Sequence, residues 1–134
     1  MTAHQAALEA LTRYFGYDSF RPGQQGIVEA LLAGRDVLGV MPTGAGKSVC
    51  YQIPAALSPG ATLVISPLIS LMRDQVDALN DLGLPAAFIN TTQTPDEQAM
   101  VFAQAAAGQI KLLYVAPERL EPGRFRDFAA RTPI

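Results

Sequence analysis

The sequence is organised around one stretch, Met41-Pro42-Thr43-Gly44-Ala45-Gly46-Lys47-Ser48. It follows an apolar run over residues 37–41 and precedes a segment with helical spacing of its apolar residues. A strand, a glycine-rich turn, a Lys-Ser pair and a helix, in this order, are typical of a phosphate-binding loop. We therefore predict a buried strand over 37–41 and a helix that begins near Lys47.

Each residue type in this stretch suits a triphosphate. Gly44 and Gly46 let the backbone curl with its N–H groups inward, where a Cβ would obstruct phosphate oxygens. The helix that follows adds the positive end of its dipole. Lys47 can reach the β- and γ-phosphates, and the Ser48 hydroxyl is an oxygen ligand of the kind that Mg²⁺ prefers. The stretch predicts a nucleotide phosphate site with Lys47 as its catalytic cation and Ser48 as its metal ligand.

The stretch departs at one position from the pattern G-x-x-x-x-G-K-[S/T], because Met41 stands where the first glycine is expected. A tight glycine turn between a strand and a helix, with no ligand, is the alternative interpretation. The position between an apolar run and a helical segment favours the phosphate loop.

Composition limits the other possibilities. The 134 residues fit one globular domain, with 49% hydrophobic and 16% charged residues. No apolar run approaches the ~20 residues needed to span a bilayer. The single cysteine, Cys50, excludes an intramolecular disulfide and favours a reducing compartment, so we expect a cytoplasmic protein. The net charge of −2 is no footprint for nucleic acid, so any DNA-binding prediction must rest on local motifs.

The rest of the chain alternates between apolar runs and helical spacing. Besides 37–41, strands are expected at 61–65, 86–89 and 112–115. Helices are expected over 4–14, from Pro22 to 32, from Lys47 until Pro54 bends or ends it, from Ser66 as N-cap to 82, over 95–107 behind a Thr94 capping box, and over 121–131. This alternation predicts an α/β fold, a parallel sheet with flanking helices and right-handed crossovers.

Three segments follow expected strand ends: 42–48, 66–70 and 116–120. Ligands of parallel α/β sheets bind beyond the carboxyl ends of the strands. We therefore expect these segments to line one rim of the sheet.

Four blocks, in order along the chain, carry a resemblance to a known family. They are Phe15-Gly16-Tyr17 with Phe20-Arg21-Pro22-Gly23-Gln24, residues 41–55, residues 64–76, and Tyr114-Val115-Ala116-Pro117-Glu118-Arg119-Leu120. Together they resemble the start of a RecQ-type DNA helicase, an ATP-dependent enzyme of superfamily 2. The resemblance implies that residues 1–134 are the N-terminal portion of the first RecA-like domain, an incomplete P-loop NTPase domain. Residues 1–35 would be a helical segment that carries the adenine-recognition motif.

The resemblance implies that the cofactors are ATP and Mg²⁺. Tyr17 and Arg21 would stack on the two faces of adenine, and both a ring and a guanidinium plane suit that role. Gln24 would bond the base edge, since an amide offers the donor and the acceptor that match adenine N7 and N6–H₂. The phosphates and Mg²⁺ would lie against the loop residues, which are Thr43, Gly44, Ala45, Gly46, Lys47 and Ser48. Without the family, Tyr17 would be junction packing and Gln24 a solvated residue.

The resemblance also implies a DNA-binding segment. Ser66, Pro67 and Ser70 would contact the DNA backbone without reading bases. N-capping by Ser66 is the alternative for that residue. Arg119 could contact DNA, or it could pair internally with Glu118 or another carboxylate.

The family couples ATP hydrolysis to 3′ to 5′ translocation and unwinding of DNA in recombination and repair. Its partners would be single-stranded and forked DNA, with a single-strand-binding protein as a further candidate, in the bacterial nucleoid or the nucleus. This sequence stops before the Asp-Glu-Ala-His segment and the second RecA-like domain, so the resemblance implies a fragment that does not hydrolyse ATP alone. Two other readings stay open, a small P-loop kinase and a non-catalytic nucleic-acid-binding module.

Overall fold

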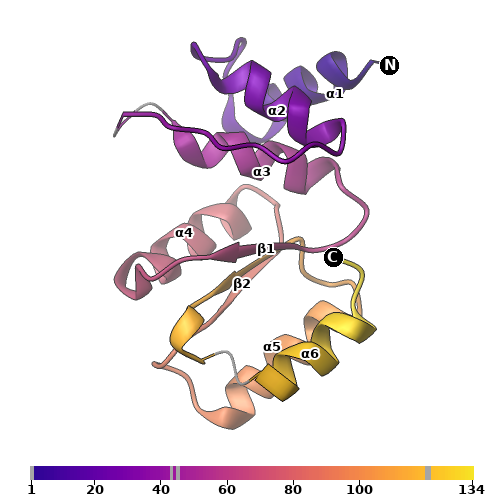
Figure 1. The fold of residues 1–134 in the computed structure, drawn as a ribbon. Helices are drawn as coiled ribbons and strands as arrows, with labels where there is room; N and C mark the ends of the chain where they lie inside the picture. Colours follow the sequence, from indigo (N-terminus) through magenta and orange to yellow (C-terminus); the bar gives the residue numbers. More distant parts are fainter. Residues whose placement is uncertain (1, 43, 45, 120–121) are drawn as a thin grey trace. The chain divides into compact units, whose positions relative to one another are not determined.

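The computed structural model describes residues 2–42, 44, 46–119 and 122–134. The chain divides into two compact units, Met1–Ser58 and Pro59–Ile134, and each is described by itself (Figure 1). Among the described residues, no helix is long and apolar enough to cross a membrane.

The first unit is helical. Helix α1, Ala3–Ala10, continues into a π-helical turn, Leu11–Phe15, and α2 and α3 span Gln24–Leu32 and Lys47–Leu57. Gly16 ends the first helical segment in the left-handed region, at φ +73°. The helices share an apolar core that comprises Ala7, Ala10, Leu11, Val28 and Ile53.

The second unit is a parallel sheet between helices. Strands β1 (Thr62–Ile65), β2 (Ala86–Ile89) and β3 (Leu112–Val115) lie in the order β1-β3-β2. Figure 1 shows α4 (Ile69–Asp81) on one face of the sheet, and α5 (Pro95–Ala106) and α6 (Pro122–Arg131) on the other. A short 3₁₀ turn, η2 (Pro117–Arg119), follows β3. The predicted parallel α/β fold is confirmed, as are these three strands and the helix behind Thr94.

The central strand shows why these runs are continuously apolar. All four residues of β3 are fully buried. Leu113 and Val115 join a core cluster with Phe128 of α6, and the alternate residues, Leu112 and Tyr114, face the opposite side of the sheet. A strand covered by helices on both faces has no polar side to present.

The predicted strand over 37–41 does not form. The segment is extended but pairs with no described strand, and the side chains of Leu38 and Val40 are 92% and 89% exposed. Its alternate residues face inward: an added Cβ on Gly39 would lie 3.0 Å from Cδ1 of Ile27. A strand needs a neighbour for its backbone hydrogen bonds, and the described part of the first unit contains only helices. The apolar pattern was real, but the prediction of a paired, buried strand was wrong.

Two helix boundaries in the first unit also differ from prediction. Pro22 does not open α2, because Gly23, at φ +88°, is the N-cap and the helix begins at Gln24. Pro54 does not end α3, which continues to Leu57. Beyond it, the backbone N–H and the hydroxyl of Ser58 both donate to the Pro54 carbonyl oxygen, at 2.9 and 2.7 Å.

A third boundary difference lies in the second unit. Ser66 is not the N-cap of α4, which begins at Ile69 with Leu68 as N-cap. The Ser66 hydroxyl instead accepts the Leu68 backbone N–H at 3.1 Å. Serine side chains often bond the backbone two residues on, and this turn competes with capping.

Candidate phosphate loop and strand-end segments

The loop backbone curls at the two glycines that the sequence singles out. Gly44 and Gly46 have φ of +85° and +79°, in the left-handed region that residues with a Cβ rarely adopt. An added Cβ on Gly46 would also collide with the Gln24 amide nitrogen. Thr43 and Ala45, predicted as loop contacts, lie outside the described residues. Glycine at 46 is therefore required twice, by its conformation and by its neighbour.

Helix α3 begins at this loop with an open N-terminus. Gly46 is its N-cap, and no described side chain caps the helix. The first N–H groups of a helix have no partner within it, and they bear partial positive charge. Lys47, exposed, and Ser48, partly buried, stand in the first turn. This start of an 11-residue helix has the donor set and charge that fit a phosphate group.

The adenine-recognition segment predicted from the sequence holds this loop. Gln24 is 3% exposed, its Oε1 accepts the Arg21 backbone N–H at 2.8 Å, and its Nε2 donates to the Gly46 carbonyl oxygen at 3.0 Å. The Arg21 guanidinium donates through Nη1 to the Gly44 carbonyl oxygen at 3.0 Å. The structure thus brings Arg21 and Gln24 against the loop, a contact that sequence reasoning missed. Nothing in a spacing of 22 residues indicates it.

Tyr17 lies on the turn before α2. Its side chain is 51% exposed, and its carbonyl oxygen accepts the Thr12 hydroxyl at 2.9 Å. Phe20, by contrast, packs against the core of the first unit. A half-exposed ring on a fixed backbone can serve as a stacking surface.

Met41 and Cys50 form an apolar contact behind the loop. Their sulfur atoms lie 3.8 Å apart, and an added Cβ on Gly23 would lie 3.7 Å from the Met41 terminal carbon. Burial raises the pKa of the Cys50 thiol, so this cysteine is a packing residue and not an activated nucleophile. The methionine at the expected glycine position thus fills space between α2 and α3.

In the second unit, two predicted DNA-binding segments start side by side. The Ser66 backbone N–H donates to the Val115 carbonyl oxygen at 3.1 Å, where β1 and β3 end. Pro67 and Ser70 are exposed, and Ser70 lies in the first turn of α4. Arg119 closes η2, and its side chain lies outside the described residues.

The turn after β2 was not predicted as part of the site. It begins beside the end of β3. The Ala116 N–H donates to the Ile89 carbonyl oxygen at 3.0 Å. Asn90 is 2% exposed, and its Oδ1 accepts both the N–H and the hydroxyl of Thr92, at 2.9 and 2.6 Å. This network fixes the chain as it leaves β2, an edge strand of the sheet.

Among the described residues, no group of three or more His, Cys, Asp or Glu side chains could hold a metal ion. Any Mg²⁺ at the loop would therefore depend on Ser48, on nucleotide oxygens and on water, the oxygen ligands that this ion retains readily.

Comparison with known proteins gives the class. The profile of the DEAD/DEAH box helicase family matches residues 21–127, so the chain belongs to this family. Membership of the family implies nucleotide use.

Individual relatives show which branch of the helicase family this chain resembles. The chain is 54% identical over 119 residues to the ATP-dependent DNA helicase RecQ of Haemophilus influenzae, covering 89% of this chain and 19% of the relative. It is 50% identical over 115 residues to RecQ of Bacillus subtilis, covering 85% and 20%. With the RecQ-like DNA helicase BLM of Xenopus laevis it shares 46% over 108 residues, covering 79% and 8%. The resemblance to RecQ-type helicases is confirmed, and the chain spans about a fifth of the length of the bacterial relatives.

A solved structure supports the fold. A hypothetical ATP-dependent RNA helicase from Sulfolobus tokodaii superposes with a TM-score of 0.69 at 21% identity, covering 92% of this chain and 37% of that one.

Proposed function

We propose that the first unit binds ATP with Mg²⁺ as the nucleotide site of a RecQ-type DNA helicase. The observation that supports this best is the Gln24 amide, which bonds the Gly46 carbonyl directly before Lys47. A segment suited to the base and a loop suited to the phosphates are thereby joined through one side chain.

The residues divide the work as follows. Backbone N–H groups at Gly46 and the start of α3 donate to the β-phosphate oxygens, and Lys47 supplies charge to the β- and γ-phosphates. Ser48 holds Mg²⁺, which neutralises phosphate charge when it is bound. Arg21 and Tyr17 stack on adenine.

The second unit would contact single-stranded DNA through its strand-end segments. Ser66, Pro67, Ser70 and Arg119 lie on segments that follow β1 and β3. The two serines and Arg119 offer hydroxyl, backbone N–H and guanidinium donors for phosphates, and Pro67 adds a packing contact. The parent protein, by its relatives, would unwind forked DNA with 3′ to 5′ polarity in recombination and repair, in the nucleoid or nucleus. A single-strand-binding protein is a candidate partner of that longer protein.

The DNA part is tested by fluorescence anisotropy with labelled single-stranded DNA at two salt concentrations. Ser70→Ala and Arg119→Ala should each weaken binding about threefold to tenfold with no change in base preference, and binding should fade with salt. Asp96→Ala, on helix α5, is the control and should leave affinity unchanged or slightly higher. Salt-insensitive binding, or equal affinities in all variants, would remove the DNA assignment.

Two other outcomes identify the competing functions. Transfer of the ATP γ-phosphate to a small metabolite would indicate a P-loop kinase. DNA binding that ignores both nucleotide and Lys47→Ala, in a chain that binds no ATP, would indicate a non-catalytic module.

A further inference from the structure

A groove runs between α5 and α6 in the second unit. It encloses about 320 Å³. Three alanines of α5, Ala99, Ala103 and Ala106, form one wall. Because they lie at helical spacing on one face, their small side chains leave room for a third element to pack close.

The bottom of the groove is a ring pair. The Phe102 and Phe128 ring centroids lie 4.7 Å apart, and Phe128 is only 7% exposed. These rings pack against each other and belong to the core cluster that includes Leu113 and Val115 of β3. They offer apolar surface to a side chain in the groove, but no free face for a stacked base.

The α6 side of the groove carries two guanidinium groups. Arg124 and Arg131 both line it, and Arg124 lies over the Phe102 ring, with its guanidinium carbon 5.4 Å from the centroid. Neither arginine forms an ion pair with a carboxylate among the described residues. Seven residues, about 10 Å of helix, separate them.

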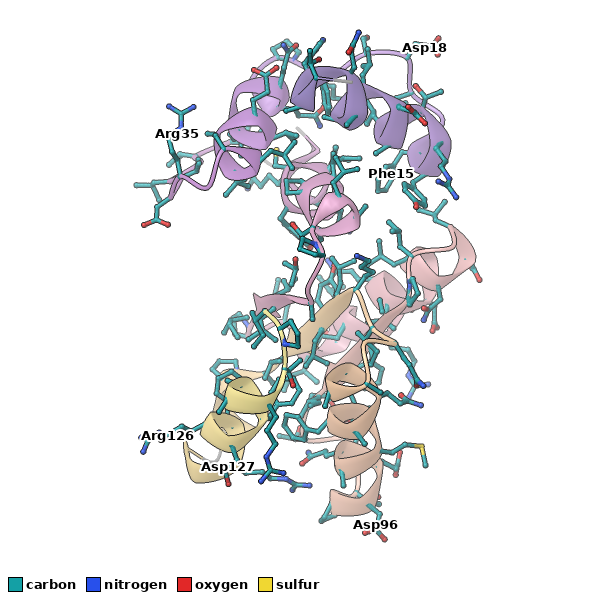
Figure 2. The ribbon with its side chains drawn as sticks, turned by 90° about the vertical axis from the view of Figure 1, so that its right-hand side faces the viewer. Phe15, Asp18, Arg35, Asp96, Arg126 and Asp127 are labelled. Atoms are coloured by element: carbon teal, nitrogen blue, oxygen red, sulfur yellow. The ribbon has the colours of Figure 1, made fainter. Side chains whose placement is uncertain are left out.

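The remaining charges of α6 add to this pattern. Figure 2 shows Arg126 extending from the side of α6 that faces away from α5, and Asp127 also lines the groove. Helix α6 thus bears three arginines and one aspartate, while the whole chain has a net charge of −2. The groove is a locally basic, apolar site on an acidic chain.

We propose that the α5–α6 groove is a docking site for an acidic amphipathic helix of a partner protein. Carboxylates seven residues apart on such a helix, two turns, match the separation of Arg124 and Arg131. Apolar side chains between them would enter the groove above Phe102 and Phe128, and the alanine wall lets the helix approach.

The same features disfavour a nucleic acid as the occupant. Single-stranded nucleic acid is held by exposed aromatic faces and a continuous cationic groove. Here the rings are covered, and the Asp127 carboxylate stands between the two arginines in sequence and would repel phosphate. A partner with discrete carboxylates can avoid Asp127, whereas a phosphate backbone presents charge along its whole length.

The test uses the chain of residues 1–134 and a fluorescein-labelled synthetic helical peptide with Glu at positions i and i+7 and Leu at i+3 and i+4. Anisotropy should show binding that the peptide with Gln in place of both Glu loses by about tenfold. Arg124→Gln with Arg131→Gln should weaken binding about tenfold, whereas Asp127→Asn should strengthen it about twofold to threefold by removing a like charge. Arg126→Gln, which keeps the groove intact, is the matched control and should bind as the unchanged chain does.

Circular dichroism of each variant ensures that only folded chains are compared. Ala103→Leu, which fills the groove without altering charge, should also abolish binding. Absence of peptide binding to the folded chain would overturn the proposal, as would equal affinity for the Glu and Gln peptides. Displacement of the peptide by equimolar single-stranded DNA would assign the groove to nucleic acid instead.

Discussion

Helices α3 and α5 have similar lengths, but their N-termini differ in how they are capped and charged. At α5, the Thr94 hydroxyl accepts the Glu97 N–H at 3.2 Å, and the Glu97 carboxylate accepts the Thr94 N–H at 3.3 Å. At α3, Gly46 is the N-cap and no described side chain caps the helix. The first turn of α5 is acidic, with Asp96 beside Glu97, whereas α3 opens with Lys47.

This difference separates a structural helix start from one suited to a ligand. The capping box satisfies the N–H groups of Thr94 and Glu97 internally, and the acidic first turn adds negative charge, so the start of α5 is poorly suited to an anion. At the start of α3, no described side chain bonds these donors. This helix start is held from outside, through the Gln24 bond to Gly46, rather than by its own cap.

Of the substitutions that distinguish the two helix starts, Gly46→Ala should have the largest effect on nucleotide affinity. Gly46 and Gly108 share φ of +79°, but an added Cβ meets the Gln24 amide at Gly46 and nothing within 4 Å at Gly108. Both alanine variants strain the backbone by about 1 kcal/mol. Only Gly46→Ala should also lower Mg-ATP affinity, by about a hundredfold, since the loop must move away from Gln24. Calorimetric titration of both variants decides, and a parallel loss in Gly108→Ala would show that backbone strain alone explains the effect.

Gln24→Ala should have a smaller and more selective effect. The Gln24 amide already bonds Arg21 and Gly46, so it would read the base edge only through its second N–H and second lone pair. Guanine presents O6 where adenine presents N6–H₂, so loss of the amide should reduce the preference for ATP over GTP about tenfold. Affinity for inorganic tripolyphosphate, which has no base, should change less. Competition against a fluorescent ATP analogue measures all three ligands. Gln25→Ala, the exposed neighbour, is the control, and unchanged selectivity in Gln24→Ala would leave Gln24 with only its loop-holding role.

Thr94→Ala tests the start of α5 in the same way. It removes the α5 cap and should lower the free energy of unfolding by roughly 0.5–2 kcal/mol without affecting nucleotide affinity. Urea denaturation followed by circular dichroism, together with an Mg-ATP titration, tests both halves. The control variant is Thr91→Ala, because Thr91 is exposed. Thr92→Ala is unsuitable as a control because the Thr92 hydroxyl bonds Asn90. Nucleotide affinity that falls with Thr94→Ala would contradict the separation of roles.

Local signals explain what the sequence predicted well. The Thr94 capping box is contained in the four residues from Thr94 to Glu97 at the start of α5. The apolar runs of β1, β2 and β3 are bounded by turn residues. Such patterns need no knowledge of distant contacts. The conformations expected at Gly44 and Gly46 followed from the same kind of local reasoning.

The features that the sequence did not predict depend on contacts between residues far apart in the chain. The 37–41 run has an apolar pattern, but a pattern does not supply the neighbouring strand that pairing requires. The bonds of Arg21 and Gln24 to the loop join segments more than 20 residues apart, so no spacing rule indicates them. Ser66 could cap a helix or close a turn, and only the backbone path decides between the two.

The central claim is that the open start of α3 binds nucleotide phosphates through Lys47. Calorimetric titration of Mg-ATP into the chain and into Lys47→Ala tests it most directly, with Arg126→Ala as a charge-matched control. A charge-assisted contact of about 1.5–3 kcal/mol predicts a tenfold to hundredfold weaker affinity for Lys47→Ala, with an unchanged circular dichroism spectrum and an unaffected control. Equal affinities for the unchanged chain and Lys47→Ala, or no binding by either folded protein, would contradict the assignment of this loop.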